Sequence, residues 1–274
     1  MFMATLSRLR KKLGLVSYHE VLQLHDAQLL SWARGTNFWQ DSSLRKKTND
    51  ALIDLFYGLV KETKPDLFIE AGAKTAFASL AIRKHLPDAR IVAFEASPEN
   101  FASYATSQPF KENQIDYRHC AVSDTTGTLT FNVRDDGVKN FGANSLLGRS
   151  SETYPVKQVT VPSTRLEDAF PDCPSNALWI DVEGASRHLI AGAKKLLPKT
   201  CAVMIEVEDR AAWEGQWLAL DVSVALMKQG LVPIARDFEL NSQHNLVFLR
   251  ANLLRSHHRA RRSIEHYHSR LSSF

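Results

Sequence analysis

The alternation of strand-like and helix-like segments between residues 65 and 250 constrains the fold of this chain most strongly. Five apolar runs read as strands: DLFIEAG, ARIVAFEAS, QIDYRHCAVSD, SNALWIDVEG and TCAVMIEVED. Most are followed by a segment with helical character. Such alternation predicts a mainly parallel sheet with helices on both faces. The last two runs, LVPIARDFE and HNLVFLR, are joined without a helix and predict a closing antiparallel pair.

We expect three parts in the chain: a helical N-terminal extension over residues 1–60, an α/β domain over 61–250, and a basic tail over 251–274. Asn49 is expected to cap the better helix of the extension, and Trp213–Gln229 to form a late helix. Residues 134–157 lack periodicity, and loops of that length are often functional. We expect this loop and the extension to cover an acceptor site.

Composition favours a cytoplasmic protein. Of the 274 residues 44% are hydrophobic, yet no apolar run approaches the roughly 20 residues of a membrane span. The N-terminal segment lacks the apolar stretch and cleavage site of a secretory signal. Three isolated cysteines match neither a disulfide framework nor a zinc site. The net charge of +4 comes from basic clusters at both ends around a nearly neutral middle.

Acidic residues stand at the ends of successive predicted strands. In an open parallel sheet, ligands bind beyond the carboxyl ends of the strands, where the strand order reverses. Glu95 follows Glu70 by 25 residues, near the spacing at which dinucleotide folds place the acid that binds the ribose. The Gly72 turn lacks a glycine-rich phosphate cradle, and Glu70 would repel a pyrophosphate. A nucleoside with a cationic tail, such as S-adenosylmethionine, fits these features better.

Four segments in order then show a family resemblance: LFIEAGAKTAF, IVAFEASPENF, HCAVSDTTGTLTF and LWIDVEGASRHLIAGAKKLL. With IDVEG as the most distinctive core, the chain resembles the FkbM family of class I S-adenosylmethionine-dependent methyltransferases over roughly residues 65–210. The resemblance implies a Rossmann-like seven-strand sheet, mostly parallel with an antiparallel closing strand. It also implies O-methyl transfer, commonly to sugars or other hydroxylated natural products.

The resemblance also implies the cofactor-binding residues. Glu70, Ala71, Gly72 and Lys74 are expected around the methionine part of the cofactor. Glu95 and Ala96 are expected around the ribose, and Ala121 and Val122 beside the adenine. Asp181 is also expected to contact the cofactor. The chain departs from the family pattern at five positions, which are Glu70 (usually Asp), Lys74 (usually Asn), Ala76 (usually Gly), Trp179 (usually Lys) and Ser186 (usually an acid). These departures motivate an alternative, a non-catalytic or merely cofactor-binding scaffold with this fold.

Asp181 and Glu183 are the candidate general bases for an acceptor hydroxyl. Residues two apart on a strand share a face, so both reach one site if the strand continues through Glu183. Alternatively, Asp181 caps the following helix or orients the cofactor amine. A divalent metal held by Asp181, Glu206 and Glu208 is compatible with oxygen ligands, but the spacing does not require one. A divalent metal is therefore left open as a cofactor, and no residue is assigned as a metal ligand.

The expected partner is a small-molecule or glycan acceptor. The basic ends admit three interpretations: solvated segments, contacts in a homo-oligomer, or contact with an anionic membrane surface. They also raise a second alternative, a nucleic-acid methyltransferase. The chain lacks the Asn/Asp-Pro-Pro-Tyr/Phe motif often used for methylating base amines, so no nucleic-acid partner is expected.

Overall fold

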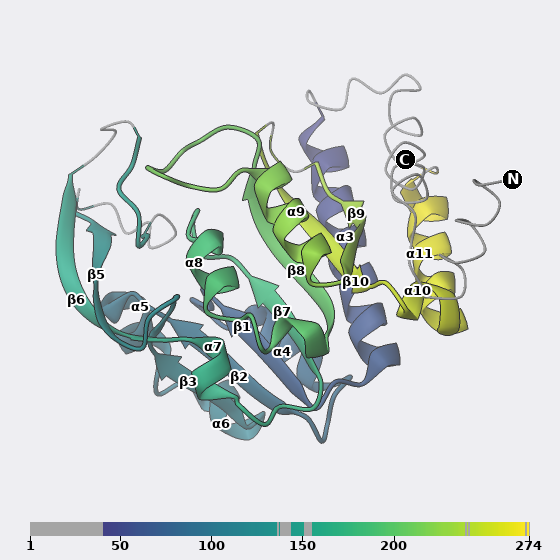
Figure 1. Cartoon of the computed structure of the whole chain (residues 1–274), viewed down its shortest axis with the longest axis horizontal. Helices are drawn as coiled ribbons and strands as arrows, with labels where there is room; N and C mark the ends of the chain where they lie inside the picture. Colours follow the sequence, from purple (N-terminus) through teal and green to yellow (C-terminus); the bar gives the residue numbers. More distant parts are fainter. Residues whose placement is uncertain are drawn as a thin grey trace, which may run out of the picture.

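A seven-stranded sheet organises the chain (Figure 1). The computed structural model describes residues 41–135, 137, 144–150, 155–238, 240, 242–271 and 273. Most of the predicted extension and part of the predicted 134–157 loop therefore lie outside the described residues. The sheet order is β3-β2-β1-β7-β8-β10-β9, with bounds Leu67–Ala71 (β1), Arg90–Glu95 (β2), Ile115–His119 (β3), Asn176–Ile180 (β7), Thr200–Glu208 (β8), Leu231–Arg236 (β9) and Gln243–Arg250 (β10).

The strand order reverses between β1 and β7. From β1 the chain steps outward through β2 and β3, then returns to the other side of β1 as β7 and continues to β8. These pairs are parallel, whereas β10 runs antiparallel to both β8 and β9. This is the class I methyltransferase topology expected from the sequence. Every residue of β1 and β7 is buried, as expected for strands covered on both faces.

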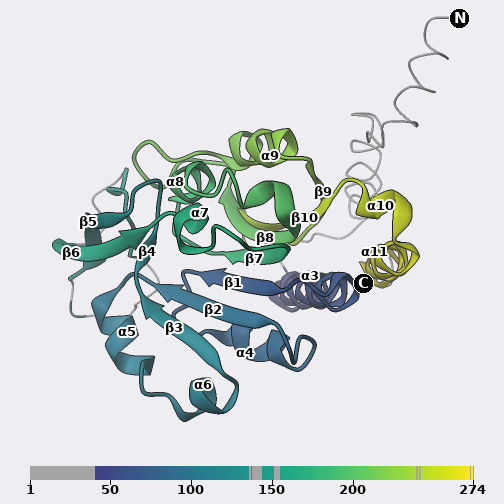
Figure 2. The ribbon, with the colours of Figure 1, turned by 60° about the horizontal axis from the view of Figure 1, so that its bottom comes forward.

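Helices cover both faces of the sheet (Figure 2). One face packs against α3, α4 and α6, and the other packs against α7, α8 and α9. The helix bounds are Ser42–Thr63 (α3), Phe77–Arg83 (α4), Pro98–Tyr104 (α5), Gln108–Glu112 (α6), Leu166–Ala169 (α7), Ser186–Ala191 (α8), Ala219–Lys228 (α9), Leu253–Ser256 (α10) and His258–Leu271 (α11), with a 3-10 turn at Leu197–Lys199 (η2).

A second, three-stranded sheet stands beside the carboxyl ends of the main strands. It is formed by Ala121–Val122 (β4), Gly127–Arg134 (β5) and Val156–Thr164 (β6) in the order β4-β6-β5. The predicted third strand is therefore divided: β3 belongs to the main sheet, and two residues further on the chain enters the second one. Phe131, Val133 and Val161 form a small core under this sheet, and its position lets it wall one side of a site.

Two predicted helices begin elsewhere than expected. Asp41, rather than Asn49, caps α3, because its carboxylate accepts hydrogen bonds from the backbone N–H groups of Ser43 and Leu44. The late helix begins at Ala219 instead of Trp213. Gly215 adopts a left-handed φ of 68°, and Trp213 forms a β-bridge with Arg149, so the preceding residues are not helical.

The basic C-terminal segment forms helix α11, which lies against α3 (Figure 1). Its buried side chains are Ala260, Ile264, Tyr267 and Leu271. Arg270 forms an ion pair with Asp54 of α3 at 2.5 Å, and the Tyr267 hydroxyl donates to the Arg236 carbonyl at 2.6 Å. Among the described residues, no helix is both long enough and apolar enough to span a bilayer.

Candidate active site

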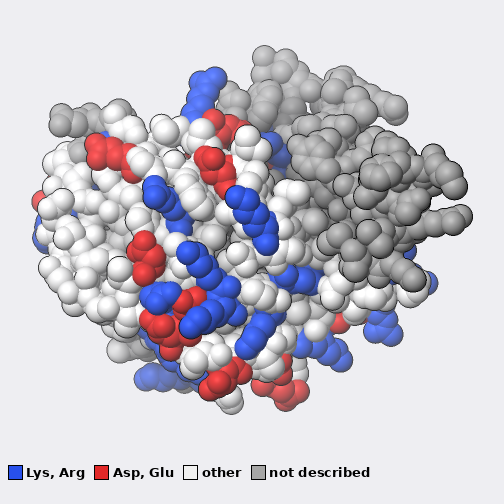
Figure 3. Space-filling model, viewed as in Figure 1, with Lys and Arg blue, Asp and Glu red and all other residues white. Residues whose placement is uncertain are grey.

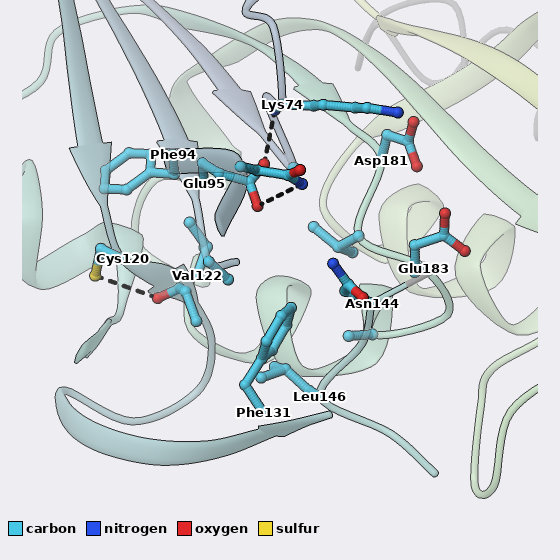
Figure 4. A pocket seen from close by; sticks show the side chains of 16 residues that line it. Lys74, Phe94, Glu95, Cys120, Val122, Phe131, Asn144, Leu146, Asp181 and Glu183 are labelled. Carbon is cyan, nitrogen blue, oxygen red and sulfur yellow. Dashed lines mark hydrogen bonds between the residues drawn. The ribbon is translucent and has the colours of Figure 1, made fainter. Parts of the chain in front are cut away.

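A cavity of about 180 Å³ opens at the carboxyl ends of β1, β2 and β7, where the strand order reverses (Figure 4). This is the position at which open α/β sheets bind ligands. Eight of the predicted site residues line it: Gly72, Lys74, Glu95, Ala96, Ala121, Val122, Asp181 and Glu183. Residues more than 100 positions apart in the sequence thus meet in one place.

The turn after β1 brings two backbones into direct contact. Gly72 has a φ of 81°, and a Cβ atom there would lie 1.6 Å from the carbonyl oxygen of Asp181. The Asp181 N–H in turn donates to the Ala71 carbonyl at 2.9 Å. Glycine is therefore required by both conformation and space. Lys74 and Ala76 also adopt left-handed φ values, 45° and 51°, so two of the departures from the family pattern stand where Asn or Gly is easier to accommodate.

Glu95 ends β2 and is held rigidly at the cavity. One carboxylate oxygen accepts from the Lys74 backbone N–H at 2.7 Å, and the other accepts from the Ser97 N–H at 2.7 Å and from the Asn100 amide at 3.3 Å. Burial raises the pKa of this carboxyl group, while the hydrogen bonds oppose the rise. The group is oriented by three donors and faces the cavity (Figure 4).

Glu70 and Ala71 do not line this cavity. The Glu70 carboxylate accepts a hydrogen bond from the Ser79 N–H of α4 at 2.7 Å, and only 1% of the residue is exposed. Its neighbour across the sheet is Trp179, whose ring packs edge-on against Phe56 and Phe77. Because side chains alternate along β1, Glu70 points to the face covered by α3 and α4, away from the cavity. Burial raises the pKa of Glu70 to about 7.

Asp181 and Glu183 lie together, but not because of strand alternation as expected. Strand β7 ends at Ile180, and Glu183 adopts a left-handed φ of 47° in the following turn. The Ser145 hydroxyl donates to the Glu183 carbonyl at 2.6 Å, which ties this turn to the segment that follows β5. The two carboxylates and that of Glu206 in β8 have oxygens within 4.8 Å of one another.

Crowding of these carboxylates raises their affinity for protons. Burial and the neighbouring acids raise the pKa of Asp181 to about 6, of Glu183 to about 8 and of Glu208 to about 7. Burial and the same neighbours raise the pKa of Glu206 as well. A group with a pKa near neutrality can accept a proton from an alcohol and release it again. The cluster thus places carboxylates that exchange protons near neutral pH beside the cavity.

Several lining residues were not predicted from the sequence, among them Phe131, Leu146 and Asn100. Phe131 lies in the extended segment TGTLTFNV, whose alternation gives a signal for a strand but not for its position over the cavity. Asn144 and Ser145 lie close to the site; Asn144 lines the cavity and its side chain accepts from the Arg134 N–H at 3.0 Å.

The sheet order, the reversal at β1 and β7, and the acid-lined cavity together define a class I methyltransferase domain. Residues 68–267 match the family model described as the methyltransferase FkbM domain. The chain therefore belongs to the FkbM family and is an S-adenosylmethionine-dependent methyltransferase.

Similarity to individual proteins is lower. The chain is 23% identical over 194 residues to the 2-O-methyltransferase NoeI of Sinorhizobium fredii (strain NBRC 101917 / NGR234), covering 66% of this chain and 75% of that protein.

Two solved structures give more distant matches. The magnesium protoporphyrin IX methyltransferase of Synechocystis PCC 6803 matches with a TM-score of 0.42 and 12% identity, covering 81% of this chain and 90% of that one. A 1,6-didemethyltoxoflavin-N1-methyltransferase of Burkholderia thailandensis matches with a TM-score of 0.39 and 14% identity, covering 86% and 91%. Both TM-scores are below 0.5, and the family assignment comes from the family model.

Proposed function

We propose that this chain transfers the methyl group of S-adenosylmethionine to a hydroxyl of a sugar, glycolipid or similar metabolite. The observation that carries the proposal is the pair of carboxylates, Asp181 and Glu183, at one end of the cavity, with Glu95 on the other side (Figure 4). An acid that binds the ribose and an acid that takes the acceptor proton are thereby separated within one site. The relative NoeI, named a 2-O-methyltransferase, supports oxygen as the acceptor atom.

In this proposal each part of the cavity has one task. Glu95 accepts hydrogen bonds from the ribose hydroxyls, and Ala121, Val122 and Phe131 border the adenine. The turn from Gly72 to Lys74 lies beside the methionine part. The donor supplies an activated methyl group attached to a good leaving group. The protein holds the acceptor oxygen in line with the carbon–sulfur bond. Such positioning can lower the activation free energy by about 7–11 kcal/mol.

In this proposal Asp181 accepts the hydroxyl proton as the carbon–oxygen bond forms, and Glu183 is the second candidate base. A positioned base contributes a factor of about 10²–10⁴. The Asp181→Asn variant keeps the size of the side chain and removes its basicity. We therefore expect turnover to fall by about 10²-fold or more, while the dissociation constant of S-adenosylhomocysteine changes far less.

Two measurements test the function. Calorimetry with S-adenosylhomocysteine reports cofactor binding, and radiolabelled S-adenosylmethionine incubated with glycan and lipid fractions reports transfer. Binding without transfer to any fraction would favour the alternative of a non-catalytic scaffold. Trp179 is the specific observation behind that alternative, because it fills the place of the usual lysine with a buried aromatic side chain. Unchanged turnover in Asp181→Asn would contradict the role of this carboxylate.

The partners and location remain proposals of the same kind. We infer a cytoplasmic enzyme with a small-molecule or glycan acceptor, in which α11 contacts either a second copy or an anionic membrane surface through the exposed side chains of Arg259, Arg261 and Arg262. On the face drawn in Figure 3, Lys and Arg side chains have Asp and Glu side chains among them. We propose no nucleic-acid partner. Flotation with vesicles containing phosphatidylserine tests the membrane contact.

A further inference from the structure

Lys74 occupies a position in the turn after β1 where its backbone is held on both sides. Its N–H donates to the Glu95 carboxylate at 2.7 Å, and its carbonyl accepts from the Tyr117 hydroxyl at 2.7 Å. Its φ of 45° is unfavourable for a residue with a long side chain. Backbone strain of this kind persists where the surrounding structure over-determines it, and it is concentrated at functional sites. The root of the Lys74 side chain therefore has a fixed direction.

That direction leads to the carboxylate cluster. Figure 4 shows the side chain of Lys74 extending from the Glu95 side of the cavity toward Asp181. Its positive charge favours the ionised forms of Asp181 and Glu183. Arg149 acts on the cluster as well, because its charge favours the ionised forms of Glu183 and Glu208. The acids thus receive positive charge from the protein itself.

The same cluster has a geometry that could suit a metal. Oxygens of Asp181, Glu183 and Glu206 lie within 4.8 Å of one another, and carboxylate oxygens are the ligands that magnesium and manganese use. The Lys74 side chain extends toward these carboxylates (Figure 4), so a divalent cation bound there would be close to its positive charge. Two positive groups close together in a partly buried site repel each other strongly.

We propose that Lys74 is the built-in cation of the transfer site, taking the place that a divalent metal would otherwise fill beside Asp181, Glu183 and Glu206. It is a positioning residue: its positive charge offsets the negative charge of the carboxylates beside the acceptor hydroxyl, and it makes methyl transfer independent of added metal. This inference rests on the proposed function for its catalytic part, whereas its prediction about metal binding does not require turnover.

The test compares wild type with Lys74→Met, which keeps most of the length of the side chain and removes the charge, and with Lys74→Arg, which keeps the charge. Lys84→Met is the matched control, since Lys84 is an exposed lysine at the end of α4 outside the site. Manganese binding is followed by the electron paramagnetic resonance signal of free Mn²⁺. Calorimetry with S-adenosylhomocysteine and thermal melting are run on every variant, and transfer is assayed with and without a chelator.

We expect Lys74→Met to bind Mn²⁺ at least about tenfold more tightly than wild type, because the repulsion is removed. Adding Glu206→Gln to that variant should abolish the gain. Lys74→Arg and Lys84→Met should bind Mn²⁺ as wild type does, and the chelator should leave wild-type transfer unchanged.

Two results would overturn the proposal. One is that the wild-type protein already binds Mn²⁺ tightly and loses this binding in Glu206→Gln. The other is that Lys74→Met has a normal melting temperature but binds Mn²⁺ no more tightly than wild type. If Lys74→Met fails to fold, Lys74→Asn replaces it, because asparagine tolerates the left-handed conformation. A failure of the proposed function would appear separately, as absent binding of S-adenosylhomocysteine in wild type.

Discussion

Replacing Glu95 with glutamine tests the cofactor site most directly, because the three donors around this carboxylate are all known. Two backbone N–H groups, of Lys74 and Ser97, donate to different oxygens at 2.7 Å each. Glutamine has one acceptor oxygen and one NH₂ group. Whichever way the amide is turned, one of the two backbone donors must face another donor. The Glu95→Gln variant therefore leaves a buried N–H without an acceptor.

The expected magnitudes follow from this geometry. An unsatisfied buried donor costs about 1–3 kcal/mol of stability, which lowers the melting temperature by roughly 2–10 °C in a chain of this size. Loss of charge-assisted hydrogen bonds to the ribose weakens the binding free energy of the cofactor by about 1.5–3 kcal/mol. That corresponds to a dissociation constant about 10- to 150-fold higher.

The assay is calorimetry with S-adenosylhomocysteine beside a thermal melt of the same preparation. Glu99→Gln is the matched control, because it makes the same chemical change at an exposed glutamate in the first turn of α5. A variant that melts lower but binds S-adenosylhomocysteine as tightly as wild type would refute the role of Glu95 in cofactor binding. In that case the carboxylate would only brace the turn at Lys74.

Two further predictions concern the neighbouring turn and the sheet. Gly72→Ala should unfold more easily than Gly215→Ala and bind S-adenosylhomocysteine more weakly. Both positions have a positive φ, which costs about 1–2 kcal/mol for alanine. Of the two, only Gly72 would place the new Cβ against a backbone oxygen, at 1.6 Å. Equal losses of stability in urea unfolding would contradict the close contact. The pKa of Glu70 in the folded state is about 7, above the ordinary value of 4.5. Between these pH values the folded state binds more protons than the unfolded state, so the free energy of unfolding falls as pH rises through that window. Glu70→Gln should remove about 2–3 kcal/mol of this fall between pH 5 and 8; an unchanged difference between urea unfolding at the two pH values would show that Glu70 is ionised at little cost.

Two of the departures from the family pattern, Glu70 and Trp179, lie side by side in the fold. The two residues are neighbours in the parallel register of β1 and β7, on the face covered by α3 and α4. A lysine at position 179 would be adjacent to the acid and could neutralise it. Tryptophan instead fills this space with an aromatic ring, and the acid is left to the Ser79 N–H. Burial is the main cause of the raised pKa of Glu70.

Local patterns were sufficient to predict the sheet and the residues at the strand ends. The apolar runs and their alternation with helices predicted a mainly parallel sheet, and the family resemblance carried by the IDVEG segment implied seven strands. Such patterns predict the sheet because they decide which side chains are buried and which strands can pair. The observed strand order confirms the predicted sheet. Boundaries were less certain, because Asp41 and Asn49 are equally acceptable caps when only the sequence is read.

The tertiary structure alone decided which acids share a site. Glu95 is the last residue of β2, whereas Glu70 is the next-to-last residue of β1. Because side chains alternate along a strand, Glu70 lies under α4 and Glu95 faces the cavity. Asp181 and Glu183 meet Glu206 through a left-handed turn that periodicity cannot reveal. The direction of Lys74 likewise depends on contacts with Glu95 and Tyr117, which lie 21 and 43 residues away in the chain. Sequence determines which groups are available, and long-range packing determines which of them face one another.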